Sequence, residues 1–396
     1  MSEDHHSIVR RQAAPASVST PVVTPIWPSV VYQSTDADAL DAQYLGETQG
    51  YTYAREGHPN AAVLAAKIDA LEGARGGVVT GSGMAAVAAV FQAVLRAGDH
   101  VVAGSQLYGK SLKLLKDELP RMGVEVTLCD PTDGGAVAAA LRPETKLVLV
   151  EVVSNPTLRV ADMAGIFAAT AGHPAMVAVD NTFTTPALYR PLAAGADLVI
   201  HSVTKMLAGH SDVTLGYAAA KDPGVAARLT EVSVAWGLTA SPFDCWLAER
   251  GMHSFELRFA RAQETAAALA HHLSGKPGVE AVIYPARPDH PDHNRAQGLL
   301  CGQGGAMVSF RLAGGREAAN AFLRAARHIP FAPTLGDVAT MFSHPAVSSH
   351  RALTTEAREA LGITEGFIRC SVGIEAPDLL MRELDQALAA SLVANA

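Results

Sequence analysis

A regular alternation of two kinds of segment, from residue 61 to about residue 250, limits the folds open to this chain. Short runs rich in β-branched residues are separated by alanine-rich stretches with helical spacing. The expected strands are Gly77–Thr80, His100–Ala103, Glu125–Leu128, Lys146–Glu151, Met176–Val179 and Asp197–His201, and the expected helices include Asn60–Leu71, Met84–Ala97 and Leu112–Arg121. This order predicts βαβ units, and hence an α/β domain with a mainly parallel sheet covered by helices on both faces.

The regions on either side of this domain have different patterns. Residues 1–60 are rich in Pro, Ser, Thr and Tyr, so we expect an extended N-terminal arm that contacts a neighbouring subunit. Residues 251–396 predict a smaller C-terminal α/β domain, which one long helix over Phe243–Leu273 joins to the large domain at 61–250. The other expected elements of the small domain are strands Val279–Tyr284, Gly305–Leu312 and Phe367–Val372 and helices near Arg316–Arg327 and Pro377–Leu392.

The composition excludes several classes of partner. The chain has 31 basic and 39 acidic residues, a net charge of −8, and no run rich in Lys or Arg, so neither nucleic acid nor a membrane surface is an expected partner. Its most apolar stretch, Met84–Leu95, is far shorter than the ~20 residues of a membrane span, and the N-terminus has no signal core. The scattered cysteines predict a cytoplasmic protein without a disulfide framework or a bound metal; they are Cys129, Cys245, Cys301 and Cys370.

Polar residues stand at the carboxyl ends of two expected strands, where open parallel sheets bind their ligands. The glycine-rich turn Thr80-Gly-Ser-Gly-Met84 opens an expected helix, whose N–H groups and dipole would attract a phosphate. The alternative is a generic tight turn. Asp180 ends an apolar strand and could pair with a cationic pyridine nitrogen, or it could simply cap the segment that follows.

Two basic residues complete this set of candidates. Lys205 follows another apolar strand, and a partly desolvated lysine there could form a Schiff base with an aldehyde, while Ser202 and Thr204 could donate to a phosphate. Arg369 stands within an apolar strand and needs an anionic partner, for which a carboxylate is the natural choice. The alternatives are a surface lysine and a structural salt bridge. The interval of 25 residues from Asp180 to Lys205, with the glycine-rich turn upstream, favours a pyridoxal-phosphate (PLP) site.

These residues belong to longer motifs that resemble those of the Cys/Met-metabolism PLP-dependent enzymes. This family comprises cystathionine γ-synthases, cystathionine γ-lyases, methionine γ-lyases and O-acylhomoserine sulfhydrylases. The resemblance runs from about Thr20 to Ala390 and implies PLP fold type I, the aspartate-aminotransferase-like architecture. Its motifs are Tyr51-Thr-Tyr-Ala-Arg55, Gly81-Ser-Gly-Met84, Val179-Asp-Asn-Thr-Phe183, His201-Ser-Val-Thr-Lys-Met-Leu-Ala-Gly-His-Ser-Asp212 and Arg369-Cys-Ser-Val-Gly-Ile-Glu375.

The resemblance implies a role for each candidate residue. Lys205 would form the aldimine with the PLP aldehyde and move protons as the catalytic base, and Asp180 would bind the pyridine nitrogen. The amides of Gly83 and Met84 and the side chains of Ser202 and Thr204 would hold the cofactor phosphate. Tyr53 and Arg55 of the adjacent subunit would also reach it, which implies an active dimer. The expected full assembly is a tetramer.

The resemblance implies the substrate site as well. Tyr108 would stack on the cofactor ring and act as a catalytic acid or base on the departing substituent. Asn155 would bond the phenolic oxygen of the cofactor and border the substrate. Arg369, helped by the backbone around Thr340, would bind the α-carboxylate of an amino-acid substrate.

The implied reaction is elimination or replacement at the γ (or β) carbon of a sulfur-type amino acid, as in transsulfuration and in cysteine and methionine biosynthesis. Cystathionine γ-lyase or γ-synthase activity is the leading expectation, and O-acylhomoserine sulfhydrylase or methionine γ-lyase activity is the alternative. Lys110 stands where methionine γ-lyases carry Cys, whereas Asp337 is similar to the Gly-Asp of sulfhydrylases and methionine lyases. A fold-type-I aminotransferase would share Lys205 and Asp180, and the intact candidate residues argue against a non-catalytic binding protein.

Overall fold

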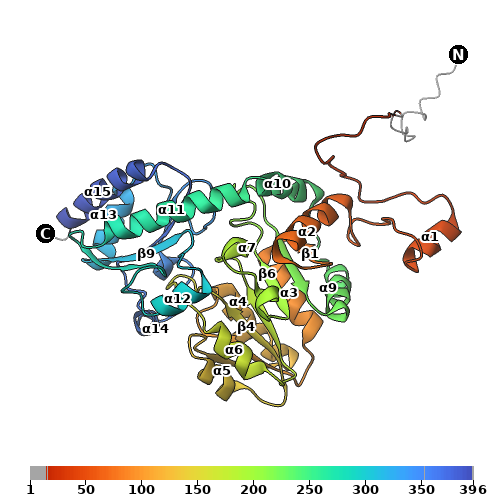
Figure 1. The fold of residues 1–396 in the computed structure, drawn as a ribbon, viewed down its shortest axis with the longest axis horizontal. Coiled ribbons are helices and arrows are strands. Elements are labelled where there is room, and N and C mark those ends of the chain that lie inside the picture. The colour runs from red at the N-terminus through yellow and green to blue at the C-terminus, as the bar shows by residue number, and fades with distance from the viewer. Residues whose placement is uncertain (1–14, 16, 352, 395–396) are drawn as a thin grey trace.

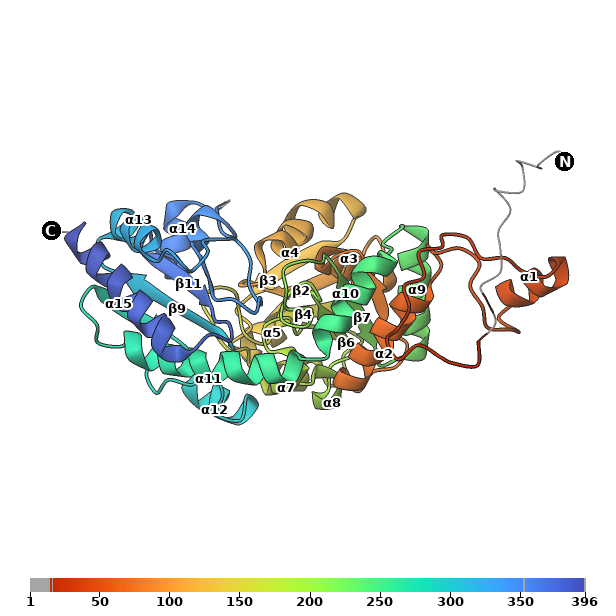
Figure 2. The same cartoon turned by 90° about the horizontal axis from the view of Figure 1, so that it is seen from above.

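The computed structural model describes residues 15, 17–351 and 353–394, so the first fourteen residues of the expected arm lie outside it. Two sheets form the body, with the arm at one end (Figures 1 and 2). The larger sheet has seven strands in the order β1-β7-β6-β5-β4-β2-β3. Its strands are β1 (Val78–Thr80), β2 (His100–Gly104), β3 (Glu125–Cys129), β4 (Thr145–Glu151), β5 (Met176–Asp180), β6 (Leu198–His201) and β7 (Gly216–Ala220).

The expected mainly parallel sheet is confirmed, with one addition. β7 pairs antiparallel with both β6 and β1, and the other pairings are parallel. The sequence of β7, Gly-Tyr-Ala-Ala-Ala, contains no β-branched residue, so local pattern gave no signal for a strand. Because β1 runs parallel to β6, the carboxyl ends of β1, β2, β4, β5 and β6 meet at one edge.

Helices cover both faces of this sheet, as predicted. Successive strand residues point to opposite faces, so Val148 packs with α2 and α6 while Leu149 packs with α3 and α9. The helices of this part are α2 (Pro59–Glu72), α3 (Gly83–Val94), α4 (Gly109–Lys113), α5 (Gly134–Ala140), α6 (Met163–Thr170), α7 (Thr185–Leu188), α8 (Pro191–Ala194), α9 (Pro223–Ala235) and α10 (Pro242–Met252).

Two expected helices are divided. The stretch over Leu112–Arg121 consists of the end of α4, a π-helical turn η2 (Leu114–Glu118) and a 3₁₀ turn η3 (Pro120–Met122), because Pro120 lacks the N–H that a continuous helix needs. The expected long helix over Phe243–Leu273 is wrong: α10 ends at Met252, and α11 (Phe255–Leu273) follows in a new direction. The Arg258 guanidinium donates to the carbonyls of Gly251 and Met206 at 3.0 and 2.9 Å, which satisfies the end of α10.

The second sheet is antiparallel throughout, in the order β10-β11-β9-β8. Its strands are β8 (Val279–Ile283), β9 (Met307–Leu312), β10 (Met341–Ser343) and β11 (Phe367–Ser371), of which β10 was not expected. α11, α13 (Gly315–Ala325) and α15 (Pro377–Val393) share one apolar core with Ile368 and Cys370. The alternation of a strand therefore turns Arg369 to the opposite face, toward the large sheet. The remaining elements are α12 (His293–Leu299), η4 (Pro345–Val347) and α14 (Thr355–Ala360).

The described part of the arm has little contact with its own subunit. The Trp246 Nε1–H donates to the Thr24 carbonyl at 2.8 Å, and the Trp27 N–H donates to the Asn60 side chain at 2.9 Å. α1 (Ala37–Tyr44) buries none of its described residues and stands away from the body (Figure 2). The exposed large apolar side chains in the described part of the arm are Val18, Val22, Val23, Ile26, Val30, Val31, Leu40, Tyr44, Leu45 and Tyr53.

Candidate active site

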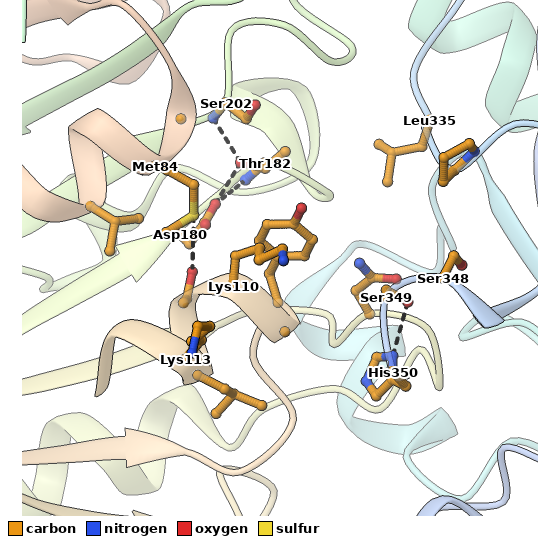
Figure 3. Close-up of a pocket in the computed structure, with 18 of the residues that line it drawn as sticks. Met84, Lys110, Lys113, Asp180, Thr182, Ser202, Leu335, Ser348, Ser349 and His350 are labelled. Atoms are coloured by element: carbon orange, nitrogen blue, oxygen red, sulfur yellow. Dashed lines mark hydrogen bonds between the residues drawn. The ribbon is translucent and has the colours of Figure 1, made fainter. Parts of the chain in front are cut away.

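A cavity of about 890 Å³ opens where the carboxyl ends of the large sheet's strands meet the small sheet. Residues from both sheets line it, including Arg369 on β11 and Asp180 at the end of β5. Figure 3 shows Asp180 among the lining residues. Nine of the residues predicted from the sequence lie on this lining: Gly83, Met84, Tyr108, Asn155, Asp180, Ser202, Thr204, Lys205 and Arg369.

Asp180 is held by the threonine two residues later. The Thr182 N–H and O–H both donate to Asp180 Oδ1, at 3.1 and 2.5 Å. Burial raises the pKa of Asp180, and the two Thr182 hydrogen bonds oppose that rise because they stabilise the ionised form. Thr182 Oγ1 also accepts the Ser202 N–H at 2.9 Å, so it joins the ends of β5 and β6 (Figure 3).

The glycine-rich turn forms the start of α3 beside Ser202. Ser82 caps this helix by accepting the Ala85 N–H at 3.0 Å, and the amides of the first turn have no acceptor within the helix. A Cβ at Gly83 would lie 2.8 Å from Ser202 Cβ, so glycine is required for the helix to approach this hydroxyl. Thr204 completes this side of the cavity, with its hydroxyl 3.0 Å from the Leu215 N–H.

Lys205 lies between the two sheets. Its Nζ donates to Thr334 Oγ1 at 3.2 Å, from the small-sheet side of the cavity. Burial lowers the pKa of Lys205, and the nearby positive charge of Arg369 lowers it further. The amine is thereby shifted toward its neutral, nucleophilic form.

Arg369 is buried, with 4% of its surface exposed. Its guanidinium donates to Asn155 Oδ1 at 2.7 Å and to the Thr334 carbonyl at 2.8 Å. The Nε atom of Arg369 has no hydrogen-bond partner among the described residues. Burial lowers the pKa of the Arg369 guanidinium to about 10. None of these contacts neutralises the charge, so the group retains the capacity to bind an anion.

Tyr108 borders the cavity with 39% of its surface exposed. Its backbone N–H donates at 2.8 Å to Oε1 of Glu151, a buried carboxyl group at the end of β4. Sequence reasoning gave Glu151 only as the last residue of the expected strand Lys146–Glu151 and missed its place in the site.

Three predicted residues lie elsewhere in the subunit. The Thr340 hydroxyl donates to Glu375 Oε2 at 2.8 Å and accepts the Gly373 N–H at 2.9 Å, away from the cavity lining. Tyr53 and Arg55 stand at the base of the arm, with the Arg55 guanidinium 5.5 Å from the Tyr53 ring centroid. Both are exposed and do not line the described cavity of their own chain.

Sequence reasoning missed further lining residues. Thr182 lay inside a quoted motif, so its hydroxyl was a readable signal, whereas Thr334 lies in a loop without a recognisable pattern. The Nδ1 atom of His350 forms a hydrogen bond with the Ser349 hydroxyl at 2.9 Å, and burial lowers the pKa of His350 to about 4. Figure 3 shows Ser349 and His350 across the cavity from Asp180.

The exposed part of the lining is cationic. Lys110, Lys116 and Arg351 are exposed side chains on it, and Lys113 forms an ion pair with Asp117. Within the described ranges, these exposed lining residues carry four positive charges and one negative charge. The opening therefore favours an anionic group.

In the described part of the chain, no group of three or more His, Cys, Asp or Glu side chains is arranged to hold a metal ion. None of the described helices is long and apolar enough to cross a membrane.

Comparisons with known proteins agree with this geometry. A family model described as Cys/Met metabolism PLP-dependent enzyme matches residues 6–389. The chain is 39% identical to the cystathionine beta-lyase of Bacillus subtilis over 342 residues, which cover 86% of this chain and 87% of the relative. It is 36% identical to the L-methionine gamma-lyase of Porphyromonas gingivalis over 369 residues, 93% and 92% of the two chains. The structure of cystathionine gamma synthase from Xanthomonas oryzae pv. oryzae in complex with cystathionine matches with a TM-score of 0.88 and 38% identity over 94% of each chain.

The described residues fit the cofactor that defines this family. A side chain at Gly83 would fill the space beside Ser202 where a phosphate can meet the amides of α3. Asp180, with its two Thr182 donors, provides a carboxylate suited to a cationic pyridine nitrogen. The predicted resemblance, the fold-type-I α/β architecture and the PLP cofactor are confirmed.

Proposed function

The chain belongs to the family of Cys/Met metabolism PLP-dependent enzymes, and from this premise we propose that it catalyses elimination or replacement at the γ (or β) carbon of cystathionine or a related sulfur-type amino acid. The observation that carries the choice of substrate is the cationic lining of the cavity opening. Cystathionine has a second carboxylate at its far end, next to a second ammonium group, and methionine has neither; the cationic lining can bind this carboxylate.

In this proposal, residues at several strand ends would hold the cofactor. Asp180 would bind the pyridine nitrogen, Asn155 would bond the phenolic oxygen, and Tyr108 would stack on the ring. Gly83, Met84, Ser202 and Thr204 would hold the phosphate. PLP supplies an electron sink for the negative charge that develops at Cα of the substrate. The geometry of Gly83 beside Ser202 and the Thr182 donors to Asp180 support these roles.

Lys205 holds and moves the protons. Its lowered pKa favours a neutral amine, which removes the Cα proton and then carries protons between neighbouring atoms of the substrate. Tyr108 is the acid or base that serves the leaving or entering sulfur, because its hydroxyl group belongs to an exposed side chain on the same cavity.

Arg369 binds and orients the substrate α-carboxylate. Its contacts to Asn155 and Thr334 fix the guanidinium while leaving its charge uncompensated. Holding the carboxylate in one place sets the direction of the Cα–H bond, which selects proton removal over loss of carbon dioxide. The role predicted for Thr340 is then indirect, through the position of Glu375 and Gly373.

The arm completes the cavity of a second subunit. Tyr53 and Arg55 are exposed in their own chain and lie next to an arm with an uncovered apolar surface, which supports contact with a partner copy. Arg55 adds a positive charge for the cofactor phosphate in trans. An active dimer follows from this sharing, and a tetramer of two such dimers remains our prediction.

The second candidate is γ-replacement on O-succinylhomoserine, as in a synthase or a sulfhydrylase. The same observation favours it, because the succinyl group ends in a carboxylate that the cationic opening can bind. O-acetylhomoserine and methionine lack that charge.

One set of incubations tests the proposal. The enzyme is given cystathionine, methionine, and O-succinyl- or O-acetylhomoserine with cysteine or sulfide, and products are identified by mass. We expect kcat/KM for the substrates with a distal carboxylate to exceed kcat/KM for the substrates without one at least tenfold, about 1.4 kcal/mol. Lys110→Ala should raise KM for cystathionine and leave KM for methionine unchanged. Methionine as the best substrate would refute the proposal.

A further inference from the structure

Two carboxyl groups end neighbouring strands of the large sheet. Glu151 is the last residue of β4 and Asp180 the last of β5, and they are Cα partners in the parallel ladder. Adjacent strands lie about 4.8 Å apart. Two positions earlier, Leu149 and Ala178 point to the face covered by α3, so both carboxyl groups project to that same face. Both line the cavity.

The two groups have unequal sets of hydrogen-bond donors. Asp180 Oδ1 receives two donors from Thr182. Glu151 Oε1 receives the Tyr108 N–H, whereas Oε2 is buried and has no partner among the described residues. Glu151 has 9% of its surface exposed. A buried carboxylate oxygen without a donor is costly, but a protonated oxygen can itself donate to a group in the cavity.

Adjacent buried carboxyl groups do not both ionise, because their charges repel in a poorly solvated place. Donors stabilise the ionised form, and the Thr182 O–H and N–H both donate to Asp180 Oδ1, so the negative charge belongs to Asp180. Burial raises the pKa of Glu151 well above its ordinary value and the neighbouring Asp180 raises it further, while the backbone N–H groups of Tyr108 and Asn155 oppose this rise without cancelling it.

We propose that Glu151 is a neutral, protonated carboxylic acid that positions Tyr108 through Oε1 and presents an O–H donor to the cavity through Oε2, leaving Asp180 as the single anion of the pair. This inference rests on the cofactor site of the proposed function and is independent of the substrate. It assigns Glu151 as a positioning residue.

The charge state of Glu151 affects the other groups that face the cavity. Lys205 lies beyond β6 and Arg369 on β11, and both are cations when protonated. An ionised Glu151 would favour the ammonium form of Lys205 and compete with Asp180 for a cationic partner. A neutral Glu151 preserves the lowered pKa of Lys205 that burial and Arg369 produce.

The test compares two variants of the holoenzyme with a buried control. Glu151→Gln keeps a neutral donor of the same shape, and Glu151→Leu removes both the donor and the acceptor for Tyr108. Glu249 is also buried and its Oε2 also has no partner among the described residues, but its Oε1 accepts the Thr24 hydroxyl at 2.7 Å and lies 3.7 Å from the Lys67 ammonium, so Glu249→Gln is the charged control.

We expect the infrared spectrum of the wild type at neutral pH to contain the C=O band of a protonated carboxylic acid, lost in Glu151→Gln and kept in Glu249→Gln. The pH midpoint of the visible cofactor band should move by less than about half a unit in Glu151→Gln, since loss of a nearby charge moves a pKa by about 1–3 units. Absence of the infrared band, or a larger shift, would overturn the neutral state.

The positioning of Tyr108 has its own readout. The visible circular dichroism of the bound cofactor should match the wild type in Glu151→Gln and change in Glu151→Leu. Identical spectra for the two variants would overturn the positioning role. None of these measurements uses turnover, so an error in the proposed substrate would leave them unaffected.

Discussion

Replacing Thr182 with valine tests the charge on which the cofactor site depends. Valine keeps the shape of threonine but lacks the hydroxyl group that donates to Asp180 Oδ1 at 2.5 Å and accepts the Ser202 N–H at 2.9 Å. The Thr182 backbone N–H still donates to Asp180 at 3.1 Å, so half of the donor set remains.

The expected magnitude follows from the lost bond. A hydrogen bond to a charged group contributes about 1.5–3 kcal/mol, which corresponds to a roughly 10- to 150-fold change in an equilibrium constant. Without this donor the pKa of Asp180 rises, so the carboxylate is protonated more readily and pairs less well with a cationic nitrogen. We therefore expect PLP affinity to fall by that factor, and to fall more steeply at lower pH.

The assay is a titration of apoenzyme with PLP, followed by visible absorption at several pH values. Thr182→Ser is the matched control, because serine keeps the hydroxyl and should bind PLP within about threefold of the wild type. Affinity of Thr182→Val within the same threefold range, or equal weakening by serine, would refute the reasoning.

Three other predictions follow from the geometry. If Arg55 acts in trans, mixed oligomers of Arg55→Ala and Lys205→Ala subunits should regain activity that neither parent has; no complementation would contradict the arm model. Arg369→Lys cannot make both guanidinium contacts and should raise KM for the amino acid at least tenfold with unchanged PLP affinity, measured by steady-state kinetics. The pKa of His350 is about 4 against an ordinary 6.5, so the unfolded chain takes up a proton first and folding stability falls as pH drops from about 6.5 to 4. In urea titrations His350→Asn should reduce this slope by at most about 1.4 kcal/mol per pH unit, and an unchanged slope would be the opposing result.

Local pattern predicted most of the large sheet because its strands are short apolar runs between amphipathic helices. It missed β7 because alanine carries no strand signal, and β7 is fixed by pairing with β1 and β6 on either side. The sequence pattern predicted one continuous helix in place of α10 and α11, because the break between them involves the Arg258 side chain. Its guanidinium donates to the carbonyl of Gly251, seven residues earlier, and to that of Met206, about fifty residues earlier.

The sequence by itself determined the residues with distinctive chemistry: Lys205 and Asp180 at strand ends, the glycine-rich turn, and Arg369 in an apolar strand. Such residues are recognisable because an isolated charge beside an apolar run needs a partner or a ligand. Only the tertiary structure decided which uncharged side chains lie against these residues and hold them in place. Thr334 reaches Lys205 and Arg369 from a distant loop, and Glu151 lies beside Asp180, because β4 and β5 pair in register and the two sheets close over one cavity. Hydrogen bonds and shared protons depend on distances in space, which a linear pattern does not contain.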